Sequence, residues 1–249
     1  MAAGAFEPEV MVDDDGRVRV ITLNRPHRLN AFTDVGYRML GAALREADDA
    51  PDVHVVLIEG AGRGFSSGVD LDCLRDGDRD AFGREFAVLI DTMVAMRKPL
   101  VAAVHGVAVG FGATLLLHCD IVAVAETARL RFPFTQIGTA PEAGSSWLLP
   151  AAVGAQRAAD LLLTSRWVDG TEAAAIGLAA RCVPDEDLAA TARALAHEIA
   201  CHPLPAVVAA KQLLKASTAA AVARASGLEG AAGHSLATDI GPLRDHRHR

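Results

Sequence analysis

Short apolar segments alternate with helical segments over the first 150 residues, and no other feature of the sequence constrains the fold as strongly. Strands are expected at 17–24, 53–60, 99–104 and 121–125, and a helix is expected at 80–96. Another helix is expected behind Thr33, a good N-cap residue, because apolar residues follow at amphipathic spacing: Leu40, Ala43, Leu44 and Ala47. Strands that alternate with helices are joined by right-handed crossovers. The sequence therefore predicts an α/β protein with a largely parallel sheet.

Beyond about Pro150 the sequence changes to alanine-rich helix, as in "LAATARALAHEIA" and "AVVAAKQLLKAS". The only further strand expected there lies within "GLAARCVP". We therefore predict a core domain over residues 1–195 and a C-terminal helical region over 196–249, which packs on the core or on a neighbouring subunit. The last six residues, "RDHRHR", are expected to be a solvated tail.

Composition argues against several classes of partner. The formal charge is −7, which disfavours broad binding to nucleic acid or to an anionic membrane surface. The four cysteines show no C-x-x-C spacing, and the N-terminus lacks a basic segment followed by a long apolar one. These features favour a reducing, cytoplasmic location. No metal site is expected, because the pairs His118-Cys119 and Cys201-His202 lack the usual ligand spacing.

The stretch from Pro99 to His118 carries no charged residue and is long enough to span a membrane as a helix. Three glycines in its middle (Gly106, Gly110 and Gly112) would weaken such a helix. A buried strand followed by a buried helix explains the stretch better, so no membrane association is expected.

The segment "GRGFSSGVDL" at 62–71 admits two interpretations. Residues 64–68 match G-x-S-x-G, the nucleophile elbow of serine hydrolases, which needs its serine between a strand and a helix. Here the strand is expected to end near Glu59, and an acidic stretch, "GVDLDCLRDGDRD", follows Ser67. The pattern therefore favours a glycine-bounded loop whose backbone N–H groups bind an oxygen atom.

Four stretches together, in this order, resemble the crotonase (enoyl-CoA hydratase/isomerase) superfamily. They are "ITLNRPHRLNAF", "GRGFSSGVDL", the run from Lys98 to Pro150, and "LTSRWVDGTEAAAIGLAARCVP". The resemblance extends from about Val18 to about Ala220. It implies a spiral of repeated ββα units with a C-terminal helical region that helps to build a homotrimer or a dimer of trimers.

The resemblance also implies a site for an acyl-CoA thioester, with coenzyme A as part of the substrate and no separate cofactor. The backbone N–H groups of Val69 and Phe111 would hold the thioester oxygen, assisted by the N-terminus of a helix over 112–118. Residues that would lie along the CoA moiety are Arg28, Leu29, Ser67, Gly68 and Lys211, with Arg25 as a further candidate for its phosphates.

Hydratases of this family use two glutamates, and the matching positions here hold Thr114 and Phe134. Neither side chain can activate water or donate a proton as a carboxylate pair does. Glu142 matches the single acidic residue of the 3,2-enoyl-CoA isomerase branch. We expect Glu142 to be the single acid/base, with its pKa raised by an apolar wall drawn from Phe132, Phe134 and Trp147.

The resemblance thus implies an enzyme that shifts the double bond of a 3-enoyl-CoA to give 2-trans-enoyl-CoA. Two alternatives remain open from the sequence. One is a hydratase-like or hydrolase-type reaction on a specialised acyl-CoA, and the other is a non-catalytic acyl-CoA binder.

Overall fold

The structure is a computed structural model that describes residues 7–236. Its strands are β1 (Val10–Asp15), β2 (Val18–Leu23), β3 (Val55–Gly60), β4 (Leu100–Val104), β5 (Val107–Val109), β6 (Ile121–Ala125), β7 (Arg129–Arg131), β8 (Trp167–Asp169) and β9 (Arg181–Val183). Its helices are α1 (Asp34–Asp49), α2 (Leu71–Asp76), α3 (Arg79–Ala95), α4 (Phe111–Thr114), α5 (Ser145–Val153), α6 (Ala155–Thr164), α7 (Gly170–Ala175), α8 (Leu188–Ala200), α9 (Leu204–Lys215) and α10 (Thr218–Ser235). Three 3-10 helices lie at Pro26–Arg28, Leu115–His118 and Asp185–Asp187.

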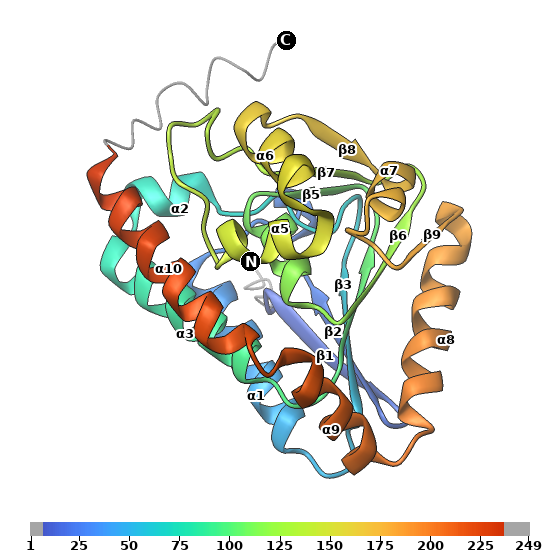
Figure 1. The fold of residues 1–249 in the computed structure, drawn as a ribbon. Coiled ribbons are helices and arrows are strands. Elements are labelled where there is room, and N and C mark those ends of the chain that lie inside the picture. The colour runs from blue at the N-terminus through green and yellow to red at the C-terminus, as the bar shows by residue number, and fades with distance from the viewer. Residues whose placement is uncertain (1–6, 237–249) are drawn as a thin grey trace, which may run out of the picture.

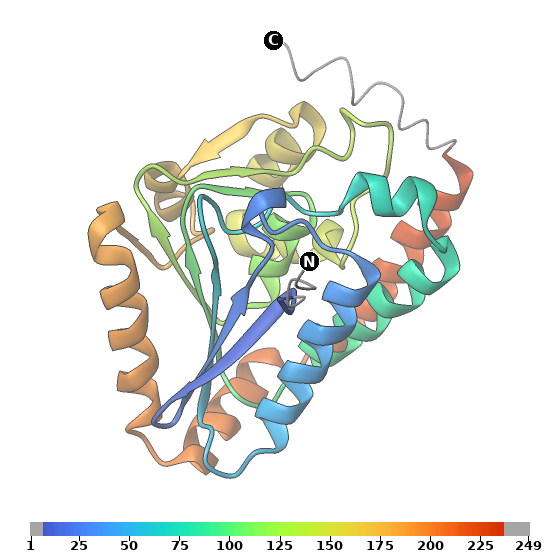
Figure 2. The same ribbon diagram turned by 180° about the vertical axis from the view of Figure 1, so that it is seen from behind.

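A six-stranded sheet forms the centre of the molecule, in the order β1-β2-β3-β4-β6-β9. All neighbours from β2 to β9 are parallel, and only β1 is antiparallel to its neighbour. Helix α8 covers one face of the sheet, and α1 and α3 lie on the other (Figures 1 and 2). Because both faces are covered, a central strand such as β4 is buried along its whole length and consists of apolar residues alone. The predicted α/β class and largely parallel sheet are confirmed.

The helix predicted behind Thr33 is α1, and the Thr33 side chain accepts a hydrogen bond from Gly36 N at 3.0 Å. This bond satisfies one of the N–H groups that the first turn leaves without a partner. The four predicted strands correspond to β2, β3, β4 and β6, and β9 lies in the predicted segment "GLAARCVP". In these segments local pattern and tertiary structure agree.

A second sheet joins β5, β7 and β8, three strands of three residues each. The expectation of a single further strand after Pro150 was wrong, because β8 pairs with β7 in this sheet. In strands of three residues, the alternation of apolar and polar residues cannot be recognised in the sequence. The N-terminal strand β1 was also not foreseen. It is an edge strand of composition VMVDDD whose last five residues are exposed, so the usual apolar alternation is missing.

The C-terminal helices lie on different sides of the sheet. The predicted boundary between residues 195 and 196 falls inside α8, which packs on β3, β4 and β6, so a division into two units there stays a prediction. Helix α10 instead runs beside α3 and packs on α5 (Figure 1). The predicted tail at 244–249 lies outside the described residues.

None of the helices in the range 7–236 is by itself long and apolar enough to cross a membrane. Only α9 and α10 taken together pass a test of length and composition, and they are bent by 49° relative to each other.

Candidate active site

The loop after β3 that contains Ser66 and Gly68 lies close to the turn after β5 that contains Gly112. Ser66 N donates to Val107 O, and Val109 N donates to Ser66 O, which ties the first loop to β5. Gly68 has a φ of +89°, and a Cβ atom there would overlap Val109 O. A Cβ atom at Gly112 would lie 2.5 Å from Ser66 O. Both positions therefore require glycine, one for its backbone conformation and both for close approach of main chain to main chain.

This approach brings two backbone donors, Val69 N–H and Phe111 N–H, to one cavity of about 780 Å³. Among the backbone hydrogen bonds of the described residues, neither N–H donates to a carbonyl. The predicted helix at 112–118 begins instead at Phe111 and continues after Thr114 as a 3-10 turn. Helix α4 has only four residues, so its dipole adds little to the two N–H donors of Val69 and Phe111. Two such donors beside one cavity can stabilise an oxygen atom that carries negative charge.

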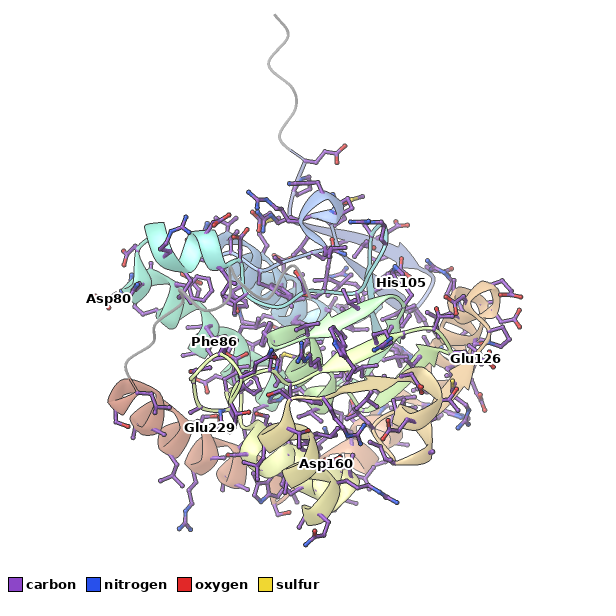
Figure 3. The ribbon with its side chains drawn as sticks, turned by 90° about the horizontal axis from the view of Figure 1, so that it is seen from above. Asp80, Phe86, His105, Glu126, Asp160 and Glu229 are labelled. Carbon is purple, nitrogen blue, oxygen red and sulfur yellow. The ribbon has the colours of Figure 1, made fainter. Side chains whose placement is uncertain are left out.

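The two serines of the first loop have no arrangement for nucleophilic catalysis. Ser66 is fully buried, and its hydroxyl donates to Asn30 O at 2.8 Å and accepts from Gly68 N at 3.1 Å. Ser67 Oγ lies 3.3 Å from Arg28 O. No histidine in the described part of the chain is hydrogen-bonded to either hydroxyl, and His105 lies well away from Phe86 of the cavity (Figure 3). The geometry of the loop is therefore not that of a nucleophile elbow.

Replacing Ser67 with alanine should leave kcat within about threefold of wild type, because its hydroxyl only touches Arg28 O. Ser66→Ala removes two buried hydrogen bonds, so it should lower the free energy of unfolding by about 1–3 kcal/mol. Its chemical step should still survive in the folded enzyme. A loss of kcat by about a thousandfold in a folded Ser66→Ala variant would mean that the serine takes part in the chemistry.

Glu142 lies in the loop that leads into α5, and the backbone of this loop is held in an unusual shape. Ala143 and Gly144 both have positive φ, 59° and 72°. The Nε2 atom of His118 lies 2.8 Å from Ala143 O. A carbonyl can only accept, so Nε2 carries the proton in this contact. Burial lowers the pKa of His118 to about 4, which keeps the imidazole neutral near pH 7.

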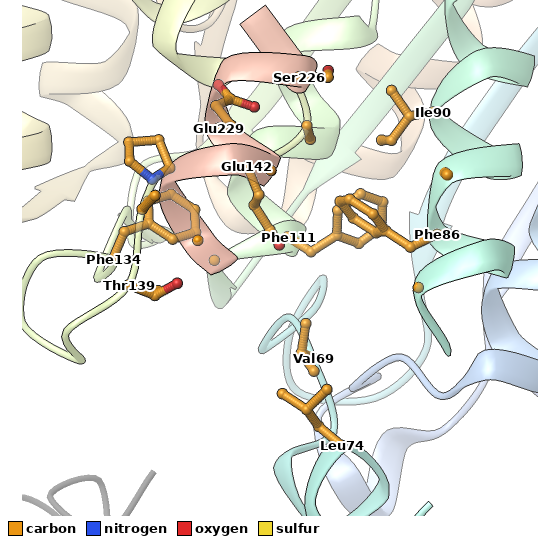
Figure 4. Close-up of a pocket in the computed structure, with 18 of the residues that line it drawn as sticks. Val69, Leu74, Phe86, Ile90, Phe111, Phe134, Thr139, Glu142, Ser226 and Glu229 are labelled. Atoms are coloured by element: carbon orange, nitrogen blue, oxygen red, sulfur yellow. The ribbon is translucent and has the colours of Figure 1, made fainter. Parts of the chain in front are cut away.

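The carboxyl group of Glu142 projects into the cavity between Phe134 and Phe86 (Figure 4). The residue as a whole is half-buried, but its Oε1 atom is shielded from solvent and has no hydrogen-bond partner among the described residues. Burial, together with the smaller effect of the nearby carboxylate of Glu229, raises the pKa of Glu142 to about 8. A carboxyl with such a pKa is a stronger base, once ionised, than an ordinary glutamate.

The apolar wall around Glu142 differs from the predicted one. Phe134 lines the cavity, but Phe132 and Trp147 do not. Phe86 and Ile90 of α3 line it instead, together with Phe111. These residues lie far from Glu142 in the sequence, so the apolar side chains around Glu142 could not be predicted from their distance along the chain.

The two positions at which hydratases carry glutamate have no replacement acid. Thr114 is fully buried, its hydroxyl donates to Phe111 O at 3.3 Å, and it does not line the cavity. Phe134 presents an aromatic ring to the cavity. A carboxylate that sequence reasoning missed is Glu229 of α10, which also lines the cavity. Its surroundings, "ASGLEGAAG", show no periodicity that would have marked its buried side.

The structure brings only one of the five predicted CoA-binding residues to the cavity, namely Ser67. Leu29 lies behind the loop, where its carbonyl accepts from Ser67 N at 2.9 Å. Arg28 is exposed and lies 3.3 Å from Asp72, and Arg25 is paired with Asp70 at 3.0 Å. Lys211 is buried away from the cavity, with Nζ 2.7 Å from Asp120 and 2.7 Å from Lys98 O. This placement gives no support to a role for Lys211 in binding CoA phosphates.

Comparison with known proteins identifies the family. Residues 13–238 match the model of the enoyl-CoA hydratase/isomerase family. A protein of Mycobacterium bovis named "Probable enoyl-CoA hydratase echA8" is 39% identical over 191 residues, which is 76% of this chain and 74% of that one. A 1,2-epoxyphenylacetyl-CoA isomerase of Escherichia coli is 37% identical over 196 residues, covering 75% and 74% of the two chains.

Solved structures agree with this result. The structure of Pseudomonas aeruginosa OdaA superposes with a TM-score of 0.89 at 34% identity and covers 98% of this chain and 100% of that one. An enoyl-CoA hydratase/isomerase from Pseudoalteromonas atlantica superposes with a TM-score of 0.88 at 32% identity, covering 95% and 94%. The predicted crotonase fold is confirmed. The chain belongs to the enoyl-CoA hydratase/isomerase family, whose members act on acyl-CoA thioesters.

Proposed function

We propose that this enzyme is an isomerase that converts a 3-enoyl-CoA to the 2-trans-enoyl-CoA, with Glu142 as its single acid/base. The observation that carries the proposal is the Glu142 carboxyl itself. Its Oε1 atom is shielded from solvent and has no hydrogen-bond partner among the described residues, and Glu142 lines the same apolar cavity as Val69 and Phe111, whose N–H groups have no backbone acceptor.

The reaction needs only these groups. The thioester oxygen accepts hydrogen bonds from Val69 N–H and Phe111 N–H, and ionised Glu142 removes a proton from C2. The electrons of the broken C–H bond move toward the thioester oxygen and give a dienolate, whose negative charge the two donors stabilise. Protonated Glu142 then returns the proton to C4, and the double bond ends between C2 and C3. No water molecule and no second acid take part.

Hydration would need a second carboxyl group able to donate a proton. Glu229 does not meet this requirement, because both of its oxygens accept backbone N–H groups. The two relatives described above carry different names, a probable enoyl-CoA hydratase and a 1,2-epoxyphenylacetyl-CoA isomerase. The preference for isomerisation therefore rests on the single carboxyl group of Glu142 that has no hydrogen-bond partner among the described residues.

The proposal is tested by comparing two substrates. A 3-enoyl-CoA should be converted to its 2-trans isomer, which is followed by the absorbance of the conjugated thioester. Hydration of crotonyl-CoA should be negligible in comparison. Efficient hydration, with kcat/KM near about 10⁶ M⁻¹s⁻¹, would show that a second acid–base group acts in the site. Binding of the 3-enoyl-CoA without turnover would favour the non-catalytic binder instead.

The proposed assembly is a homotrimer or a dimer of trimers. Large apolar side chains are exposed on the C-terminal helices, with Leu213 79%, Leu214 83% and Leu228 65% exposed. Burial of such side chains against another subunit removes apolar surface from water. Light scattering at micromolar concentration should give about 78 kDa, three times the 26.0 kDa chain, or twice that value. A mass of one chain would contradict the prediction.

A further inference from the structure

Glu229 holds the N-terminus of α5 from a different part of the chain. Its Oε2 atom accepts from Gly144 N at 2.8 Å, and its Oε1 atom accepts from Ser146 N at 2.8 Å. The sequence at the start of α5 provides no side-chain cap of its own, because the N-cap residue is Gly144. A carboxylate from α10 therefore satisfies two N–H groups that would otherwise lack a partner, and its charge opposes the positive end of the α5 dipole.

The contact between α10 and this loop is tight. Glu229 is only 7% exposed, and a Cβ atom at Gly144 would lie 2.7 Å from Val222 Cγ1. Seen from above, Glu229 lies where α10 meets the segment that leads into α5 (Figure 3). Glu142 is two residues before Gly144, so the hydrogen bonds to Glu229 fix the part of the loop that carries the candidate base.

The charge of Glu229 also acts on Glu142 directly, because both carboxyl groups line one cavity. Three further titratable groups belong to the elements around this part of the cavity. The Tyr37 hydroxyl of α1 is buried, which raises its pKa and keeps it neutral. The His118 imidazole is neutral near pH 7, as described above, and Asp91 of α3 lines the same cavity. No lysine or arginine of the described chain lines the cavity, so no cationic side chain there offsets the Glu229 charge.

We propose that Glu229 is a positioning residue of this active site: a fixed carboxylate that holds the Glu142 loop and places a negative charge in the same cavity as Glu142. The proposal rests on the function proposed above. Helix α10 would then be part of the active site, because its residue Glu229 supplies both the hydrogen bonds that hold the Glu142 loop and a fixed negative charge.

The test is the pH dependence of kcat/KM on a 3-enoyl-CoA. Glu142 must be ionised to accept the C2 proton, so the wild-type value should rise with pH through about 8. Glu229→Gln has nearly the same shape, but it removes the charge and its amide can accept only one of the two N–H groups. Because the charge is gone, the rising limb of the kcat/KM profile should move to lower pH by about one unit or more. A limb that moves by less than about 0.3 units would overturn the proposal.

Glu229→Asp provides the second variant. It keeps the charge, but its side chain is one methylene shorter and cannot reach both N–H groups. Its kcat should fall at every pH while the rising limb stays at the wild-type position. A limb displaced by about one unit in Glu229→Asp would overturn the proposal even if Glu229→Gln does not fold. The matched control is Glu198→Gln, which alters an exposed glutamate of α8 and should leave rate and limb unchanged.

The proposal and the proposed function fail in different ways. The pKa of Glu142 can be read without turnover, as the carboxyl infrared band that is lost in Glu142→Gln. If this band titrates at the same pH in wild type and in Glu229→Gln while Glu142→Gln is inactive, only the role of Glu229 is wrong. If Glu142→Gln remains active, the proposed function is wrong whatever the effect of Glu229.

Discussion

Replacing Glu142 with glutamine is expected to lower kcat on a 3-enoyl-CoA by about 10²–10⁴-fold, the range that a general base usually contributes. Glutamine has nearly the same size as glutamate but cannot take up the C2 proton. The N–H groups of Val69 and Phe111 stay in place, so affinity for the acyl-CoA should survive. The measurement is steady-state turnover together with equilibrium binding of a non-isomerisable acyl-CoA.

The same variant reports on stability, which shows whether it is folded. The Glu142 carboxyl keeps its proton up to about pH 8 in the folded protein, against an ordinary value of 4.5. The unfolded chain loses that proton earlier, so this group lowers the stability of the wild type progressively as pH rises from 4.5 to about 8. Glu142→Gln removes this effect. The melting temperature of the variant minus that of the wild type should therefore increase between pH 5 and pH 8. A decrease of this difference over the same pH range would argue against a buried, protonated carboxyl.

Replacing Gly68 with alanine is expected to lower kcat by about 10²–10³-fold, the usual effect of losing one donor to an oxyanion. The added Cβ atom would overlap Val109 O, and the φ of +89° disfavours any side chain. The loop must therefore shift, and the Val69 N–H group shifts with it. Turnover at saturating substrate measures the loss.

Gly16→Ala is the matched control for backbone strain. Gly16 also has a positive φ, +64°, but a Cβ atom there would have no neighbour within 4 Å, and Gly16 lies outside the cavity. It should lose about 1–2 kcal/mol of stability while kcat stays unchanged. If a folded Gly68→Ala variant keeps kcat within about threefold of wild type, the Val69 N–H group is not an oxyanion donor.

The parts of the fold that local pattern determines could be predicted from the sequence. The buried strand β4 is a continuous apolar run, and α1 combines an N-cap at Thr33 with regular apolar spacing. The resemblance matched both loops at once and so placed Val69 and Phe111 in one site, whereas the close approach at Gly68 and Gly112 is seen only in the structure. In each case the residues that carry the signal are neighbours in the chain or belong to a recognisable motif.

The remaining features depend on contacts between distant segments. Glu229 reaches α5 across 83 to 85 residues of sequence, and Phe86 faces Glu142 only because α3 packs there. Lys211 was expected to lie along the CoA moiety but is buried against Asp120. The strands β5, β7 and β8 have three residues each and exist only as partners of one another. No local pattern could have indicated any of these pairings.

Exchange of the C2 protons of a 3-enoyl-CoA with deuterated solvent tests the central claim most directly, because it observes proton removal by the enzyme. We predict that the wild-type enzyme catalyses this exchange and that Glu142→Gln slows it by the same factor as kcat, about 10²–10⁴-fold. Exchange at the wild-type rate in a folded Glu142→Gln variant would show that another group removes the proton and would contradict the mechanism.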